Sequence, residues 1–229
     1  MIKALIFDFD GLILDTESPE YDSWKAIYAD YGLELPIHLW MAAVGQGYQG
    51  FHPLDYLEQQ LGQPVDRPAL LARHRQQDDA AIAQNPVLPG VEDYLRAAKH
   101  HGLKLAIASS SSHRWVDSHL QRLGLFDYFD AIRCADDVQR KKPAPDLFLA
   151  ALTALNVPAH AAIVLEDSAN GITAARAAGI YAVAVPNAIT RHADLSHADY
   201  ILPGLNSLPL PDLLIHIARQ RNGPKETCS

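Results

Sequence analysis

Cysteine and positive charge are both scarce in this chain. Its 229 residues include 2 cysteines, Cys134 and Cys228, which lie far apart in the sequence. A disulfide framework or a cysteine-based metal site is therefore excluded. Lysine and arginine number 19 against 27 aspartates and glutamates, so the formal net charge is −8. No diffuse positive field is available to hold a polyanion, and we expect neither nucleic acid nor a membrane surface as a partner.

Long apolar runs are also missing. Runs such as Ala4–Phe7 and Ile163–Leu165 are far shorter than the roughly 20 residues that a membrane-spanning helix requires. Asp8 and Asp10 interrupt the early apolar stretch, which argues against a secretory signal peptide. We therefore expect a cytoplasmic protein. Hydrophobic residues still make up 48% of the chain, enough for a real core, so wholesale disorder is excluded.

Short apolar segments alternate with helical patterns over most of the chain. Strands are predicted where an apolar run ends abruptly at polar residues: Ala4–Phe7, Leu103–Ala108, Ile163–Leu165 and Ala182–Val185, with weaker candidates at Ala131–Arg133 and Tyr200–Leu202. Helices are predicted between them, over Val91–His100, Trp115–Leu123, Asp146–Leu155 and Gly171–Ala178. This alternation predicts an α/β fold with a doubly wound, Rossmann-like parallel sheet.

One long segment lacks this alternation and contains no convincing strand. Residues 16–86 are predicted to form a helical bundle, inserted into a core made of residues 1–15 and 87–229. Ser18, followed by a proline and a glutamate, is the expected N-cap of the first of these helices. The further helices are expected over Pro36–Val44, Leu54–Leu61 and Ala69–Ala83. At the other end of the chain, the polar composition of residues 222–229 predicts a disordered tail.

Acidic and hydroxyl side chains follow three of the predicted strands. Asp8 follows the first strand, Ser109 the next, and Glu166 with Asp167 the strand at 163–165, while Asp10 lies two residues beyond Asp8. In a parallel sheet these strand ends meet at one edge, where ligands bind. Clustered carboxylates repel one another unless a cation lies between them. Hard oxygen ligands of this kind indicate Mg²⁺.

Lys142 supplies the expected positive charge at this edge. Pro143 and Pro145 fix the backbone and hold the lysine on a stiff turn that leads into a helix. We interpret the preceding Arg140 and Lys141 as solvated neighbours. A carboxylate nucleophile, a hydroxyl, a lysine and a divalent cation together indicate a phosphoryl-transfer site. The amide of Ser110, at the start of the next helix, is a further candidate for binding phosphate.

The motifs match a known family in order and in context. Asp8-Phe9-Asp10-Gly11, Ser109, Lys142-Pro143 and Glu166-Asp167-Ser168 resemble the four motifs of the haloacid dehalogenase superfamily of phosphatases. The resemblance covers most of the chain and is weakest over the helical insert. That insert is similar to the cap of the subgroup that includes phosphoglycolate phosphatase and β-phosphoglucomutase. The resemblance implies a core of that superfamily with a helical cap.

The resemblance also implies a role for each matched residue. Asp8 would be the nucleophile that forms an aspartyl-phosphate. Asp10 would first protonate the leaving alcohol and then activate water. Ser109 would donate a hydrogen bond to the transferring phosphoryl group, and Lys142 would anchor its charge.

The same resemblance implies a set of metal ligands. Asp8, the main-chain carbonyl of Asp10, and Asp167 with help from Glu166 would hold Mg²⁺. Whether Glu166 binds the metal directly or through water stays open. The acid at position 10 also favours phosphoryl chemistry over dehalogenation, because a departing halide needs no proton.

A Mg²⁺-dependent phosphatase is the leading hypothesis, acting on a small phosphorylated metabolite such as a sugar phosphate or a phosphoglycolate-like acid. A sugar-phosphate mutase is the alternative, although the chain has Glu20 where the mutase carries a cap histidine. A phospho-acceptor signalling module is disfavoured, because such modules lack both Asp10 and the insert. The oligomeric state is open, with a monomer as the default expectation.

One glycine pattern resembles a dinucleotide-binding fingerprint. Gly45-Gln-Gly47-Tyr-Gln-Gly50 has the required spacing, but it follows a helical pattern and no βαβ unit surrounds it. We interpret it as a flexible cap loop facing the substrate. The 11 histidines are scattered, so histidine-based metal binding is not expected either.

Overall fold

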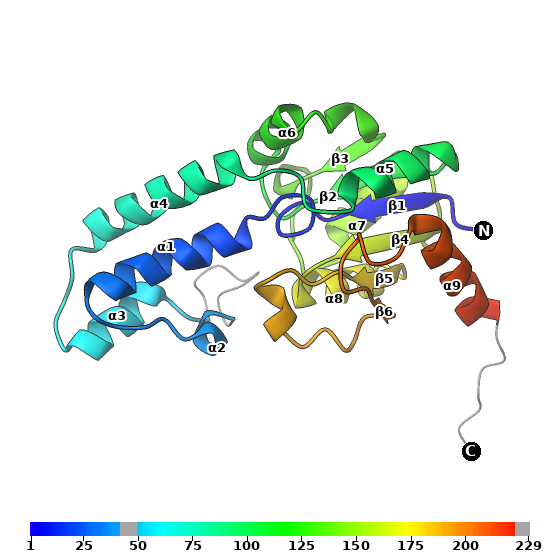
Figure 1. The fold of residues 1–229 in the computed structure, drawn as a ribbon. Coiled ribbons are helices and arrows are strands. Elements are labelled where there is room, and N and C mark those ends of the chain that lie inside the picture. Colours follow the sequence, from blue (N-terminus) through cyan, green and yellow to red (C-terminus); the bar gives the residue numbers. More distant parts are fainter. Residues whose placement is uncertain (42–49, 223–229) are drawn as a thin grey trace, which may run out of the picture.

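A parallel six-stranded sheet forms the centre of the molecule (Figure 1). The computed structural model describes residues 1–41 and 50–222. The strand order is β3-β2-β1-β4-β5-β6, and every neighbouring pair runs parallel. The strands are β1 (Ala4–Phe7), β2 (Lys104–Ala108), β3 (Ala131–Arg133), β4 (Ala162–Glu166), β5 (Tyr181–Ala184) and β6 (Tyr200–Ile201). The sheet confirms the predicted α/β class with its doubly wound parallel arrangement.

Helices connect these strands and also form the insert after β1. They are α1 (Glu17–Asp30), α2 (Ile37–Trp40), α3 (Pro53–Leu61), α4 (Arg67–Gln84), α5 (Val91–His100), α6 (His113–Arg122), α7 (Asp146–Leu155), α8 (Ala169–Ala177) and α9 (Leu210–Asn222). Short helical turns lie at η2 (Phe126–Tyr128), η3 (Ala135–Asp137), η4 (Ala159–Ala161) and η5 (Thr190–His192). The predicted bounds of α5 and α7 agree with the structure.

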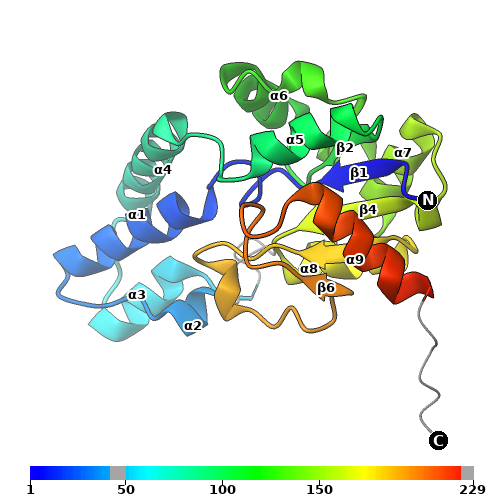
Figure 2. The same ribbon diagram turned by 45° about the vertical axis from the view of Figure 1, so that its right-hand side comes forward.

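Both faces of the sheet are covered by helices (Figure 2). Successive strand residues point to opposite faces, so Leu5 and Phe7 pack with α5, α6 and α9, whereas Ala4 and Ile6 pack with α7 and α8. All four side chains are fully buried. Burial on both faces explains why the central strands β1 and β4 are apolar up to their carboxyl ends, whereas the edge strands β3 and β6 are only partly buried.

The helices α1 to α4 form a separate layer beyond the carboxyl ends of the strands (Figure 1). They surround their own hydrophobic cluster, in which Trp24, Tyr28, Trp40 and Leu57 are buried. The side chain of Ile189, from the loop after β5, joins this cluster. The insert therefore has a core of its own. It contacts the sheet region at this loop and also through Ile82 of α4, whose side chain packs in the core of the sheet region and whose carbonyl accepts from Arg122.

The two connections between the insert and the sheet region run side by side. The side-chain amide of Asn85 donates to the carbonyl of Asp15 over 2.7 Å. The amide of Leu88 donates to the carbonyl of Ile13 over 2.9 Å. The two crossings between the insert and the sheet region thus lie close together in space.

Some local predictions need correction. Ser18 is not the N-cap of α1: Thr16 occupies that position, and Ser18 donates its amide to Asp15 Oδ1 over 3.0 Å, so the helix starts earlier. Helix α2 covers Ile37–Trp40 within the predicted 36–44, of which residues 42–44 lie outside the described part. Helix α9 is missing from the prediction, although Leu210, Leu213 and Ile217 carry helical spacing and are buried. Residues 45–49 of the glycine motif and residues 223–229 of the predicted tail lie outside the described residues. The predicted tail starts one residue too early, because Asn222 is the last residue of α9.

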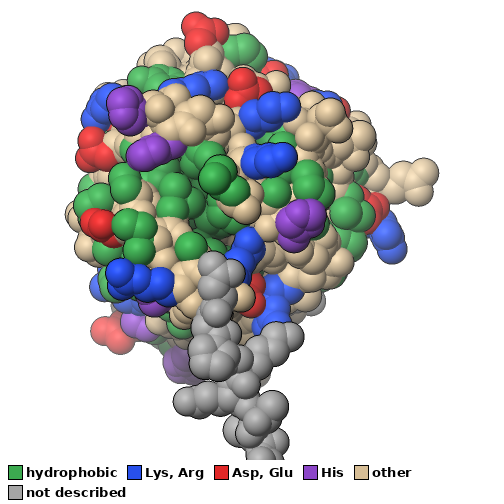
Figure 3. Space-filling view, turned by 90° about the vertical axis from the view of Figure 1, so that its right-hand side faces the viewer, with side chains coloured by type: hydrophobic (Ala, Val, Ile, Leu, Met, Phe, Trp, Pro, Cys, Tyr) green, Lys and Arg blue, Asp and Glu red, His purple; other side chains and the backbone are tan. Residues whose placement is uncertain are grey.

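Figure 3 shows the face of the molecule that is turned away from the insert. Lysine, arginine and histidine side chains surround hydrophobic ones there. A cavity of about 560 Å³ on the sheet domain is lined by Arg176 and Arg221, among others. Arg221 donates to the carbonyl of His160 over 2.8 Å, and Arg176 donates to that of His197. Both guanidinium groups therefore tie backbone segments together.

Candidate active site

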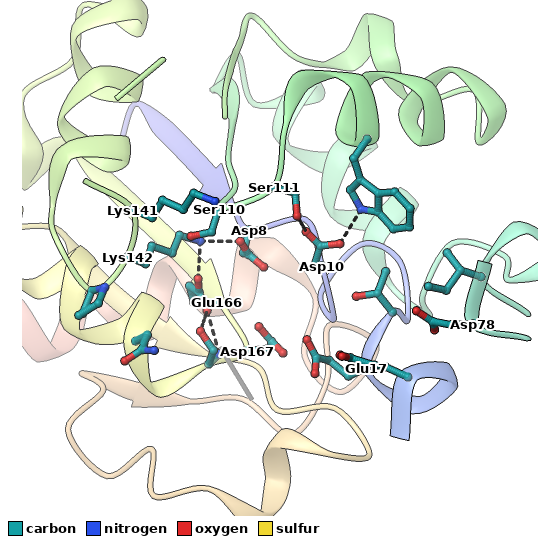
Figure 4. Close-up of a pocket in the computed structure, with 17 residues that line it drawn as sticks. Asp8, Asp10, Glu17, Asp78, Ser110, Ser111, Lys141, Lys142, Glu166 and Asp167 are labelled. Carbon is teal, nitrogen blue, oxygen red and sulfur yellow. Dashed lines mark hydrogen bonds and ion pairs between the residues drawn. The ribbon is translucent and has the colours of Figure 1, made fainter. Parts of the chain in front are cut away.

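The carboxyl ends of the central strands meet at a cavity of about 1020 Å³ (Figure 4). Asp8 follows β1, Glu166 is the last residue of β4, and Asp167 comes next, and all three line the cavity. Ser109 follows β2 and is fully buried beside them. The neighbouring pairing of β1 with β2 and with β4 explains this convergence, because it aligns the ends of the three strands.

Lys142 joins two of these carboxylates. Its Nζ donates to Asp8 Oδ1 and to Glu166 Oε1, each over 2.5 Å. The side chains of Lys142, Asp8 and Glu166 are only 5%, 9% and 1% exposed. Burial lowers the pKa of Lys142, but the two carboxylates outweigh it and raise that pKa above its usual value. The ammonium group is therefore held charged beside Asp8.

Three carboxylates around this lysine form a candidate metal centre. Ligand atoms of Asp8, Glu166 and Asp167 lie within 4.8 Å of one another, and all three residues are buried. Burial raises the pKa of Asp8 to about 8, although Lys142 acts in the opposite direction. Burial, together with the charges of Glu166 and Asp8, also raises the pKa of Asp167. Three oxygen donors with unfavourable mutual repulsion fit a hard divalent cation such as Mg²⁺.

Asp167 is held by a residue that the motifs do not include. Asn187 Nδ2 donates to Asp167 Oδ2 over 2.8 Å and to the carbonyl of Gly11 over 3.1 Å. A Cβ on Gly11 would lie 2.4 Å from Asp167 Oδ2 and 2.6 Å from Asn187 Nδ2, and its φ is +76°. Glycine is therefore required here both for the backbone conformation and for the close approach of the carboxylate.

Glu166 is fixed from the opposite side by the start of α8. Its Oε2 accepts the amide of Ser168 over 2.8 Å and the hydroxyl of Ser168 over 2.9 Å. The same hydroxyl oxygen accepts the amide of Gly171 over 3.1 Å, which makes Ser168 the N-cap of the helix. A Cβ on Gly171 would lie 1.7 Å from Glu166 Oε1. Close packing of α8 against the carboxylate thus depends on this glycine.

Asp10 has a different set of partners. Its Oδ2 accepts from Ser111 Oγ over 2.7 Å and from Ser109 Oγ over 3.3 Å. Its Oδ1 accepts from the indole Nε1 of Trp115 over 2.8 Å. The Asp10 side chain is thus aimed at the serine loop and α6, apart from the carboxylate cluster. The predicted contribution of its main-chain carbonyl to a metal site stays a prediction.

Ser110 lies where a phosphate-binding residue is expected. It lines the cavity just before α6, close to Lys142 in the close-up view (Figure 4). The N-cap of α6 is Ser112, whose side chain accepts the amide of Trp115. Binding of phosphate by Ser109 and Ser110 stays a prediction.

The insert contributes the opposite wall of the cavity. Glu17 and Glu20 of α1 and Asp78 of α4 line it, together with Ile82. Burial and the nearby Glu20 raise the pKa of Glu17 to about 8 and that of Asp78 to about 7. The wall that faces the reacting end therefore carries three carboxyl groups, and two of them ionise at a higher pH than usual.

Several site residues escaped the sequence-based prediction. Asn187 follows β5 by three residues, so the rule that found Asp8 could also have found it. Trp115 was predicted only as the first residue of a helix. No pattern in the local sequence predicts its hydrogen bond to Asp10. Asp78 lies 68 residues from Asp10 in the chain, and only the tertiary fold brings it to the cavity.

Comparison with known proteins identifies the family. A family model described as "Haloacid dehalogenase-like hydrolase" matches residues 5–185. The chain belongs to this family. The family predicted from the four motifs is therefore confirmed, and this haloacid dehalogenase-like hydrolase is a phosphoric monoester hydrolase.

Relatives of this hydrolase cover nearly its whole length. A Bacillus subtilis (strain 168) protein named "Putative phosphatase YhcW" is 43% identical over 220 residues, which is 96% of this chain and 100% of that protein. The Escherichia coli (strain K12) "Fructose-1-phosphate phosphatase YqaB" is 36% identical over 187 residues, covering 80% of this chain and 95% of the relative.

A solved structure shares the fold of this hydrolase. It is a variant of CbbY from Rhodobacter sphaeroides in complex with xylulose-(1,5)-bisphosphate. The two chains are 29% identical with a TM-score of 0.69, over 91% of this chain and 96% of the other. Across residues 1–41 and 50–222 of the present hydrolase, none of the helices combines the length and the apolar character needed to cross a membrane.

Proposed function

We propose that this chain is a Mg²⁺-dependent phosphatase that hydrolyses a small phosphorylated metabolite through an aspartyl-phosphate on Asp8. The observation that carries the proposal is the buried group formed by Asp8, Lys142, Glu166 and Asp167 at the floor of the cavity. A buried carboxylate beside a charged lysine can attack phosphorus while the lysine neutralises the phosphoryl oxygens. The names of the phosphatase relatives agree with this chemistry.

The first half of the reaction forms the covalent intermediate. A carboxylate oxygen of Asp8 attacks phosphorus, and the bond from phosphorus to the leaving oxygen breaks. Asp10, on the opposite side of the cavity floor, gives its proton to the departing alkoxide, so that a neutral alcohol leaves. Ser109, Ser110 and Lys142 bind the phosphoryl oxygens during this transfer.

The second half returns the enzyme to its starting state. Asp10, now ionised, takes a proton from a water molecule whose oxygen attacks the same phosphorus. The bond between phosphorus and Asp8 breaks, which releases inorganic phosphate. Trp115 and Ser111 hold the Asp10 carboxylate in one orientation and so support both proton transfers.

Residues Asp8, Glu166 and Asp167 would hold Mg²⁺, with the main-chain carbonyl of Asp10. The bound ion would neutralise the charge of the carboxylates and of the phosphoryl group. Asn187 fixes one oxygen of Asp167, and Ser168 fixes one oxygen of Glu166, so both ligands are oriented before an ion binds.

The insert would act as the cap of this enzyme. We assign residues 16–86 to the cap and residues 1–15 and 87–229 to the catalytic core. The paired crossings at Asp15 with Asn85 and at Ile13 with Leu88 support this division. Closure of such a cap would exclude water before the first transfer. A cytoplasmic, monomeric enzyme remains our expectation.

A sugar-phosphate mutase is the alternative reading of the same site. It shares the nucleophile and Asp10, but it returns the phosphoryl group to a sugar rather than to water. Mutase activity would be recognised by isomerisation that needs a catalytic bisphosphate and gives no net phosphate release.

The proposal is tested by phosphate release from a panel of phosphorylated metabolites, with Mg²⁺ and with a chelator. Asp8→Asn should abolish release from every substrate, and the chelator should do the same to the wild type. Asp93→Asn, which makes the same change on the exposed surface of α5, is the control and should keep full activity. Release at the wild-type rate from Asp8→Asn would show that Asp8 is not the nucleophile.

A further inference from the structure

The two ends of the cavity differ in their positive side chains. Lys141 and Lys142 carry the positive charges among the lining residues that the structure describes, and both lie at the reacting end, beside the carboxylates that would hold the metal ion (Figure 4). The cap wall carries the carboxylates Glu17, Glu20 and Asp78 with no lysine or arginine among its described lining residues. In Figure 4, Glu17 and Asp78 lie on the side of the cavity opposite Lys142. A bound phosphoester would therefore place its phosphate near the lysines and its leaving group near the carboxylates.

One carboxylate oxygen of this wall, Asp78 Oδ1, lacks a hydrogen-bond donor in the described structure. Asp78 Oδ1 is buried, and it makes no hydrogen bond within the described structure. An ionised carboxylate accepts hydrogen bonds and donates none, so the group that satisfies it must carry O–H or N–H. A buried acceptor without a partner is costly, which makes a donor from the substrate favourable at this position.

We propose that the cap wall formed by Glu17, Glu20 and Asp78 selects phosphomonoesters whose leaving group is uncharged and rich in hydroxyl groups, such as a sugar. The same wall rejects substrates with a second anionic group, either a carboxylate or a second phosphate. This inference rests on the proposed phosphatase function. Of the two substrate classes considered for that function, it retains the sugar phosphates and excludes the phosphoglycolate-like acids. It also disfavours the mutase alternative, which requires a bisphosphate.

Two pairs of substrates that differ mainly in charge measure the effect of a second anionic group. Glucose 6-phosphate and 6-phosphogluconate differ chiefly by a carboxylate, and fructose 1-phosphate and fructose 1,6-bisphosphate by a phosphate. We expect kcat/KM to be about tenfold to hundredfold higher for the neutral member of each pair, because like charges in a partly desolvated cleft repel strongly. Measurement at about pH 9 keeps the carboxylates of the wall ionised.

Variants of the cap wall then test whether its carboxylates cause the preference for substrates without a second anionic group. The double variant Glu17→Gln with Asp78→Asn should reduce the preference at least fivefold, because two of the three charges are gone. Asp79→Asn, an exposed position next to Asp78 that does not line the cavity, is the matched control and should keep the preference. If the double variant does not fold, the salt dependence of the wild type provides the second measurement. The preference should shrink as ionic strength rises from about 0.02 to 0.3 M.

Two results would overturn the inference. One is equal kcat/KM of the wild type for both members of the pairs, while the activity still depends on Asp8. The other is an undiminished preference in the folded double variant. Failure of the proposed phosphatase function would give a different result: no metabolite of the panel would then show phosphate release that depends on Asp8.

Discussion

Replacement of Lys142 by methionine tests the electrostatics of the site independently of catalysis. Methionine keeps the length of the side chain and its contact with the core, but it removes the ammonium group. Asp8 and Glu166 then lose a partner at 2.5 Å each, while Asp167 stays close to both. Three buried carboxylates would remain without a positive side chain between them.

The expected loss of stability follows from this geometry. Removal of one partner from a buried ion pair costs about 3 to 5 kcal/mol, because the remaining charge is left buried. Proton uptake by the carboxylates limits the loss, and burial already raises the pKa of Asp8 to about 8. A folded-state pKa above the unfolded value favours the folded protein more as the pH falls. We therefore expect Lys142→Met to lose about 3 kcal/mol at pH 8 and less at pH 5.

Urea unfolding of metal-free protein at both pH values measures the effect. Lys141→Met removes the same charge from an exposed neighbouring side chain and should change the free energy of unfolding by less than about 0.5 kcal/mol. Mg²⁺ at 100 times its Kd should return about 2.7 kcal/mol to any variant that still binds it. A loss below about 1 kcal/mol for Lys142→Met at pH 8 would refute the reasoning that the lysine neutralises this cluster.

Three further predictions concern single contacts. In the variant Gly171→Ala, the new Cβ would lie 1.7 Å from Glu166 Oε1 and should displace that carboxylate. We expect a lower kcat and a loss of about 1 to 3 kcal/mol in the free energy of unfolding, measured by thermal unfolding. A more stable variant would contradict this prediction. Trp115→Phe removes the donor to Asp10 Oδ1. The value of kcat/KM, which reports formation of the aspartyl-phosphate, should therefore fall about tenfold for alkyl phosphates and much less for p-nitrophenyl phosphate, whose leaving group needs no proton. Equal losses of kcat/KM for both substrates would exclude a role in positioning the general acid. Burial raises the pKa of Asp78 to about 7, so this group makes the fold less stable as the pH rises from about 4 to 7. In urea unfolding, Asp78→Asn should therefore raise the free energy of unfolding by about 1 kcal/mol at pH 8 and leave it unchanged at pH 4.

The sheet and its strand-end residues could be predicted because the physics there is local. A strand that is buried on both faces must be apolar throughout, so its end is marked by the first polar side chain. Asp8 after β1 and Glu166 at the end of β4 illustrate this, and parallel pairing brings the two together. Lys142 could be predicted for a related reason, since the prolines after it fix the turn that points it toward the strand ends.

The cap wall could not be predicted in the same way. In the sequence, Glu17 and Asp78 resemble ordinary solvent-exposed acidic residues on amphipathic helices. Helical periodicity does not indicate which surface of a helical bundle contacts a neighbouring domain. Their position depends on the packing of α1 against α4, where Ser23 Oγ and His74 Nδ1 lie 2.5 Å apart and Trp24 stacks on His74. Such contacts between positions about 50 residues apart leave no regular pattern in the sequence.

One loop shows how the core and the cap depend on each other. Asn187 holds Asp167 through its Nδ2, and its Oδ1 accepts the amides of Ile189 and Thr190 over 2.8 and 2.9 Å. Ile189 in turn packs in the hydrophobic cluster of the cap helices. The residue that orients a candidate metal ligand therefore belongs to the same rigid turn as the residue that contacts the cap. If the insert moves as a cap, as we propose, a displacement of Ile189 would reach Asp167 through a single side chain, that of Asn187.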